Sequence, residues 1–164
     1  MTVRFLTRVC LGSLLVVGWF PAFAGDSVAG HLPVNSGGRE CAALADGFLA
    51  AKLGLWQQRL WLADWKISIV MSTAKELKPK TLGNIHWDAT NKTAVIRVLA
   101  AAEYPLQCPV MLEDMEFTVV HELIHLELSS LPRSQASRRD EEHAVNQITD
   151  ALLALERRND GSSR

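Results

Sequence analysis

The chain has 164 residues, of which 48% are hydrophobic and 21% are charged, and its formal net charge is −1 at pH 7. This length is enough for one domain with a single hydrophobic core. The chain shows no internal repeats. It also carries no basic stripe of the kind that binds a phosphate backbone, so we expect no nucleic-acid partner.

Residues 1–24 have the three parts of a secretory signal peptide. Arg4 and Arg8 form a positive start, an apolar stretch runs from Val9 to Phe20, and Ala22-Phe23-Ala24 is a small-residue cleavage site. The apolar stretch is short for a membrane span. We therefore expect cleavage after Ala24, a periplasmic or secreted protein, and no stable membrane span after cleavage. The alternative is an uncleaved N-terminal anchor.

After a flexible lead-in at 25–38, apolar residues recur at helical spacing over 40–62. The next segment, 64–71, instead alternates apolar and polar residues, which is typical of a half-buried strand. We expect the folded domain to cover 39–158 and to end in a disordered tail at 159–164.

Two further strands are predicted at 82–87 and 93–99. They flank a polar turn at 88–92, and Ile96 and Val98 give the second strand its β-branched character. This pattern predicts a β-hairpin.

Two cysteines follow the predicted signal peptide, Cys41 in the first helix and Cys108 in a loop at 104–109. Neither belongs to a C-x-x-C pair, which argues against a zinc knuckle or a thioredoxin-like centre. In an exported protein two cysteines are a natural disulfide. Two buried free thiols are the alternative.

The segment 111–131 contains the candidate catalytic and metal-binding residues of the sequence. It is apolar around most of its circumference, which predicts a buried helix. Its centre, His121-Glu122-Leu123-Ile124-His125, is an H-E-x-x-H motif. Residues four apart share a helix face, so both imidazoles can bind one metal ion while Glu122 meets a water molecule. The alternative is two separately hydrogen-bonded core histidines.

A catalytic zinc ion usually takes three protein ligands and keeps one position open. The metzincin and inverted motif variants are absent, so a third ligand must come from another segment. After a polar turn, residues 138–158 again show helical spacing. The apolar positions expected to face the core there are Ala144, Val145, Ile148, Leu152 and Leu155.

A carboxylate from this second helix would complete a His-His-Glu site. Periodicity alone does not choose between Glu141 and Glu142. We prefer Glu142, because Asn146 lies one turn later and can hold a ligand histidine. For Asp140 and Glu141 we expect a solvated N-terminal turn.

The stretch HELIHLEL, followed after a short turn by EEHAVNQITDALLAL, resembles the small gluzincin-type (minigluzincin-like) metallopeptidases. It is similar in particular to the compact ImmA/IrrE-like and SprT-like domains, over residues 115–155. The resemblance implies that the third ligand is a Glu four residues before an Asn, which Glu142 and Asn146 match. In such zincins an edge strand above the motif helix often binds extended substrate, which points to 83–87 or a neighbouring strand. These groups are largely intracellular, so the predicted export is a departure from them.

We therefore expect an α+β fold: a compact zincin-like domain with an N-terminal helix, a small sheet with a hairpin, the motif helix and a C-terminal ligand helix. The expected function is an exported metallopeptidase with one Zn²⁺ per chain and a peptide or protein substrate, in which Glu122 is the general base. His143 and Tyr104 are candidates for stabilising the oxyanion. The alternatives are a non-catalytic binding module stabilised by zinc and an amidase acting on a non-protein amide. The sequence specifies no oligomeric state.

Overall fold

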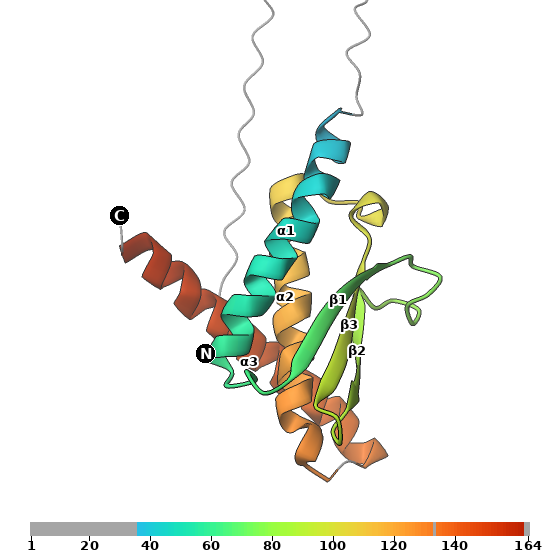
Figure 1. Cartoon of the computed structure of the whole chain (residues 1–164), viewed down its shortest axis with the longest axis vertical. Helices are drawn as coiled ribbons and strands as arrows, with labels where there is room; N and C mark the ends of the chain where they lie inside the picture. The colour runs from blue at the N-terminus through green and yellow to red at the C-terminus, as the bar shows by residue number, and fades with distance from the viewer. Residues whose placement is uncertain (1–35, 133, 163–164) are drawn as a thin grey trace, which may run out of the picture. The chain divides into compact units, whose positions relative to one another are not determined.

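The computed structural model describes residues 36–132 and 134–162. The predicted signal peptide lies outside the described residues. The described part contains three long helices, α1 (Ser36–Arg59), α2 (Cys108–Glu127) and α3 (Gln135–Ser162), and three strands, β1 (Lys66–Ser72), β2 (Gly83–Asp88) and β3 (Thr93–Leu99) (Figure 1). Short 3₁₀ turns at Ala101–Glu103 and Leu128–Ser130 flank α2. The predicted α+β class is confirmed. None of the described helices is both long and apolar enough to cross a bilayer.

The three strands form one mixed sheet with β3 in its centre. β2 and β3 pair antiparallel, with Gly83 opposite Val98, which confirms the predicted hairpin. β1 pairs with β3 in parallel, and the sequence did not predict that partner. The central strand is the most apolar of the three, and its Ile96 and Val98 are fully buried. β2 is consequently an edge strand.

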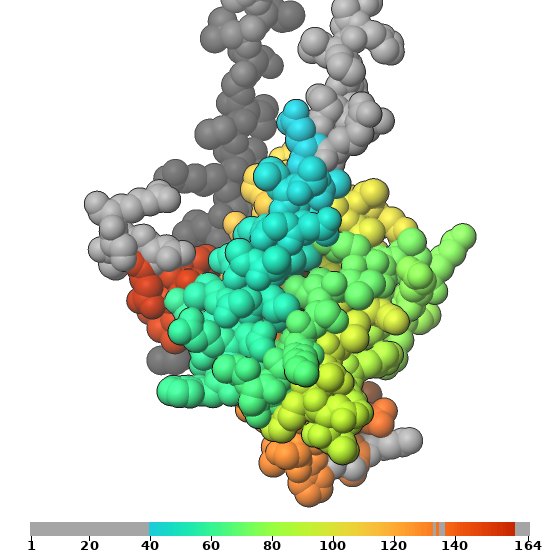
Figure 2. All heavy atoms as spheres, viewed as in Figure 1, coloured from blue at the N-terminus to red at the C-terminus, as the bar shows by residue number. Residues whose placement is uncertain are grey.

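Helix α2 lies between α1 and the sheet (Figure 1). In Figure 2 the side chains of α1 and of the strands cover most of α2, whose orange C-terminal end emerges beside the tip of the hairpin. The core between these layers contains Trp56 and Leu49 of α1 and Met115, Val119 and Leu123 of α2, all with at most 1% of their surface exposed. The predicted burial of the motif helix is confirmed.

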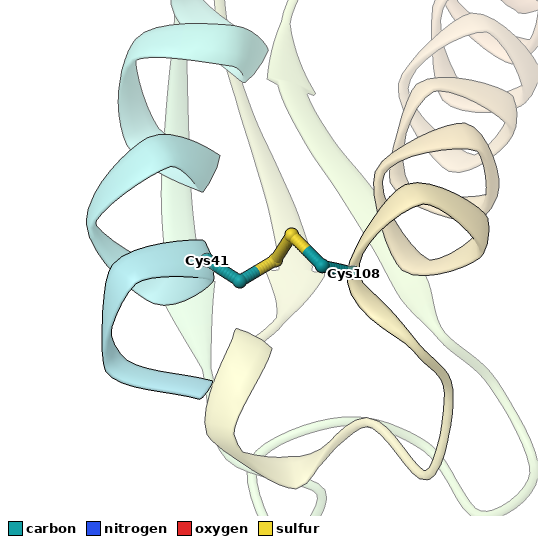
Figure 3. The surroundings of a disulfide bond; sticks show 2 residues. All are labelled: Cys41 and Cys108. Atoms are coloured by element: carbon teal, nitrogen blue, oxygen red, sulfur yellow. A yellow bond between two sulfur atoms is a disulfide. The ribbon is translucent and has the colours of Figure 1, made fainter. Parts of the chain in front are cut away.

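A disulfide joins Cys41 of α1 to Cys108, the first residue of α2 (Figure 3). The two Cα atoms are 5.7 Å apart, which is ordinary for a bridged pair. The predicted pairing is confirmed. The bridge fixes the first turn of α2 against α1.

Several helix boundaries differ from the sequence expectations. α1 begins at Ser36, inside the expected lead-in, and α3 runs to Ser162, through most of the expected disordered tail. α2 begins at Cys108 rather than Met111, with Pro109 in its first turn. A proline is tolerated there because the first N–H groups of a helix have no partner within the helix.

The buried stripe of α3 also differs from the predicted one. Ile148 and Leu155 were expected to face the core, yet 42% and 54% of their surfaces are exposed. Thr149 and Glu156 are buried instead. Each has a partner that makes burial of a polar group tolerable: the Thr149 hydroxyl donates to the Val145 carbonyl at 2.8 Å, and Glu156 forms an ion pair with Arg59.

Candidate metal centre

Three side chains from α2 and α3 bring their ligand atoms together. His121 Nε2 and His125 Nε2 are 3.1 Å apart, since the two residues are one turn apart on α2. The Glu142 carboxylate of α3 reaches both: Oε2 is 3.4 Å from His121 Nε2, and Oε1 is 3.3 Å from His125 Nε2. This group can hold a metal ion.

The spacing of these atoms fits a small tetrahedral ion. Zinc binds nitrogen and carboxylate oxygen at about 2.0–2.1 Å, so two ligands at the tetrahedral angle lie about 3.3–3.4 Å apart. The nearest separations between His121, His125 and Glu142 are close to that value, with a different oxygen of the Glu142 carboxylate facing each histidine. One ligand atom from each residue lies within 4.8 Å of the other two. Two imidazoles and a carboxylate are also the donor set of many catalytic zinc sites.

Glu141, the neighbour of Glu142, has a different place. Its Oε1 lies 3.0 Å from His125 Nδ1, and only 16% of its side-chain surface is exposed. The expected solvated position of Glu141 is therefore wrong, whereas Asp140 is exposed as expected. A carboxylate that accepts the Nδ1–H of a histidine fixes the ring orientation and leaves Nε2 to bind a metal.

Burial, the adjacent His125 and two neighbours on α3 determine the protonation of His121. Burial lowers its pKa, and so does the adjacent His125, while Glu142 and the Asn146 side chain act in the opposite direction. The net effect is a lowered pKa, so His121 is neutral near pH 7, which is the form that binds metal. Asn146 thus interacts with His121; from the sequence, either ligand histidine was open to it.

Glu122 points toward β2, and only 8% of its surface is exposed. Burial, assisted by the negative charge of Glu142, raises the pKa of Glu122 to about 7, although His125, Lys78 and the Ile85 backbone N–H act to lower it. Glu122 lies beside the ligand group without belonging to it. Its carboxylate can therefore exchange a proton near neutral pH.

Gly83 allows β2 to approach this part of α2. A Cβ atom at Gly83 would overlap the Thr118 methyl group and would lie 2.7 Å from the Arg97 carbonyl oxygen. It would also be 3.8 Å from Glu122 Oε1. Glycine is thus the residue that lets the edge strand lie directly over the motif helix.

The ligand group opens into a cleft of about 600 Å³. Its walls are the 78–82 loop, β2, α2 and the first turns of α3. His86 and Trp87 of β2 line the cleft. From the sequence, a structural role was the expectation for these two residues and a functional role the alternative.

The structure does not bring the two oxyanion candidates to the ligand atoms. His143 is exposed on α3 and does not line the cleft. Tyr104 packs against the core, and burial, together with the charge of Asp114, raises the pKa of its hydroxyl. Neither residue is in a position to bind an oxyanion at the ligand group in this conformation.

Sequence reasoning missed Glu141 and the basic residues of the cleft. Two adjacent glutamates at the start of a helix were the available signal for Glu141, since one can bind the metal while the other holds a histidine. For Lys78 and Arg138, which line the cleft, spacing gives no comparable signal.

No protein-family model, curated protein or solved structure matches this chain. The functional argument therefore depends on the geometry of the residues themselves.

Proposed function

We propose that this chain is an exported, zinc-dependent metallopeptidase of the zincin type. The observation that carries the proposal is the convergence of His121, His125 and Glu142 at zinc-like spacing, with the non-ligand Glu122 beside them. A purely structural zinc site has no need of a buried non-ligand carboxylate beside the ligands, because burying a carboxylate is costly.

Zinc, when bound by these three residues, lowers the pKa of water and polarises a carbonyl group. Glu122 accepts the proton of the attacking water and later delivers it to the leaving amine. Its pKa of about 7 suits both steps, because the same group must accept and release the proton. Glu141 keeps His125 in the tautomer with Nε2 directed to the ligand group.

The edge of β2 provides a means of aligning a peptide. The Leu99 N–H donates to the Leu82 carbonyl at 2.8 Å, so this pair bonds across the hairpin. Pairing alternates in an antiparallel ladder, so the backbone groups of Gly83 point away from β3. At Ile85 the N–H acts on Glu122, and the carbonyl oxygen lies 3.1 Å from His86 Nδ1. Because β2 lines the cleft, an extended substrate can pair with this edge beside Glu122.

Export is the part of the proposal that rests on the predicted signal peptide at residues 1–24 and on the disulfide. A Cys41–Cys108 bridge fits an oxidising compartment, where such bonds persist. The periplasm and the extracellular space both meet that condition.

The test combines a metal assay with a peptide-library cleavage screen. We expect about one zinc per purified chain and cleavage of a subset of peptides. Glu122→Gln should retain zinc and lose about 10²–10⁴-fold in turnover, because the general base is removed while the shape is kept. Glu127→Gln is the matched control, since Glu127 is exposed at the end of the same helix and does not line the cleft. Unchanged turnover in Glu122→Gln would refute the mechanism and favour a structural zinc.

A further inference from the structure

Three cationic side chains line the cleft. Lys78 and Lys80 belong to the loop before β2, and Arg138 lies in the first turn of α3. The ion pairs that lysine and arginine form in the described part of the chain involve other cations, namely Lys52, Arg59 and Lys92. The three cations of the cleft therefore have no carboxylate partner among the described residues.

The carboxylates that line the same cleft are turned to the protein. Glu142 contacts both histidines, and Glu141 contacts His125. Asp114 is half-buried, and its Oδ2 is closed off from solvent. Glu122 is buried and has the role of general base in the proposed function. The exposed charges of the lining that make no ion pair with a described residue are therefore the three cations.

The backbone that carries Lys78 and Lys80 is an ordered turn. Thr81 donates two hydrogen bonds to the Lys78 carbonyl, from its N–H at 3.1 Å and from its hydroxyl at 2.9 Å. Lys80 adopts a left-handed conformation with φ of 66°, which closes the turn after Pro79. The buried Leu77 anchors the segment in the core. The hydrogen bonds of this turn therefore fix the backbone positions from which the Lys78 and Lys80 side chains extend, just before β2.

Lys78 also lies near the reacting groups. Its charge acts on Glu122, and both residues line the same cleft. A substrate group that binds Lys78 therefore lies in the cleft that holds the general base.

Resting on the proposed peptidase function, we propose that Lys78 and Lys80, with Arg138 from the α3 side, bind a carboxylate of the substrate next to the scissile amide. An acidic side chain and a free C-terminal carboxylate offer the same chemistry. The enzyme therefore prefers anionic peptides to their neutral counterparts.

The experiment uses peptides derived from one sequence found in the cleavage screen. They carry either Glu or Gln beside the scissile bond and end in either a free carboxylate or an amide. KM and kcat are measured for wild type, Lys78→Met, Lys80→Met and the control Lys75→Met. Lys75 is exposed in the same loop but does not line the cleft.

We expect KM for the preferred anionic peptide to be about tenfold lower than for its neutral counterpart. Each of Lys78→Met and Lys80→Met should raise KM for the anionic peptide about three- to fivefold, because exposed ion pairs are modest in strength. The kcat value of Lys80→Met should stay within about twofold, whereas that of Lys78→Met can also change because the Lys78 charge acts on Glu122. Lys75→Met should change neither parameter. The preference should weaken at high salt, where exposed charges are screened. The Glu and Gln peptides with amide ends test the side chain, and the free-acid ends test the terminal carboxylate.

Binding of the same peptides to the zinc-loaded Glu122→Gln variant separates the two proposals. Fluorescence anisotropy that shows the anionic preference, with no cleavage by wild type, would refute the peptidase function and support the carboxylate site. Equal KM and equal binding for all peptides, or a preference that survives in both lysine variants, would overturn the carboxylate site. If no peptide is cleaved in the screen, peptides of unselected sequence are used instead, again with Glu or Gln and with a free or amidated C-terminus. Absence of binding to these peptides would also overturn the carboxylate site.

Discussion

Two clusters of buried polar groups, one in each half of α2, are arranged in opposite ways. In the N-terminal half, Glu116 is buried, and it accepts a hydrogen bond from Trp56 Nε1 at 2.8 Å and pairs with Lys52 Nζ at 2.9 Å. In the C-terminal half, His121 and His125 direct their Nε2 atoms at each other and at a carboxylate. The Glu116 carboxylate is paired with protein donors, whereas the histidines and the carboxylate of the second cluster present lone pairs that can bind a cation. We call the half with Glu116 the structural end of α2 and the half with the candidate metal site its chemical end.

The largest effect expected from breaking the chemical end is loss of zinc. His121→Ala or His125→Ala should weaken zinc binding about a thousandfold, since each removes one of three ligands. Titration with a competing chelator measures the affinity. His143→Ala is the matched control, because His143 is exposed on α3 outside the cleft, and it should bind zinc as wild type does.

Removing the disulfide tests the structural end. The bridge closes a loop with a sequence separation of 67 residues, and the double variant Cys41→Ala/Cys108→Ala should lose roughly 2–4 kcal/mol of unfolding free energy. Denaturant unfolding measures the change. Zinc stoichiometry at low denaturant should stay at one per chain, and a loss of zinc there would mean that the two ends of α2 are coupled.

Glu116→Leu should lower the free energy of unfolding without changing zinc affinity. It leaves the Trp56 N–H buried without an acceptor, which should cost about 2 kcal/mol of unfolding free energy. Lys52 retains some exposure and can turn to solvent, so its contribution is smaller. Zinc affinity measured at 25 °C should not change, and a tenfold loss would contradict the division of α2 that we describe.

The smallest expected effect concerns the residue that orients a ligand. Glu141→Gln should lower zinc affinity by about tenfold, because His125 loses the carboxylate that holds its Nδ1–H. Glu142→Gln removes a ligand atom and should have a clearly larger effect on the same assay. Asp140→Gln is the matched control on the same turn, since Asp140 is exposed and does not line the cleft. Equal losses of zinc affinity in the Glu141 and Glu142 variants would contradict the assignment of Glu142 as the ligand and Glu141 as the residue that orients His125.

Local patterns were sufficient for the elements that local physics determines. The apolar circumference around 121–125 predicted a buried helix, and the polar turn at 88–92 between β-branched runs predicted the hairpin. Both are present. The cysteine pair was predictable because the two cysteines that follow the predicted signal peptide allow a single pairing within the chain.

Partner choice was not predictable in the same way. Alternation in β1 indicates a strand but carries no information on whether it pairs with β2 or β3, or in which direction. The rotation of α3 is set by distant contacts, including the Arg59–Glu156 ion pair, which buries Glu156 and leaves Leu155 exposed. The adjacent Glu141 and Glu142 project about 100° apart on the helix, so only the position of α2 decides which oxygen meets which nitrogen.

The metal ligands are close together in the sequence, and this affects how the domain folds. The candidate ligands His121, His125 and Glu142 all lie C-terminal to the segment that the disulfide encloses, and Glu141, beside Glu142, is only 16 residues from His125. Bringing them together requires only that α2 and α3 fold back on each other across a short turn, which costs little loop-closure entropy. The ion site is therefore the property of a helical hairpin, while the cleft above it needs the whole sheet. We expect a chain with a damaged sheet to retain this helical hairpin, so metal content alone would be a poor measure of correct folding.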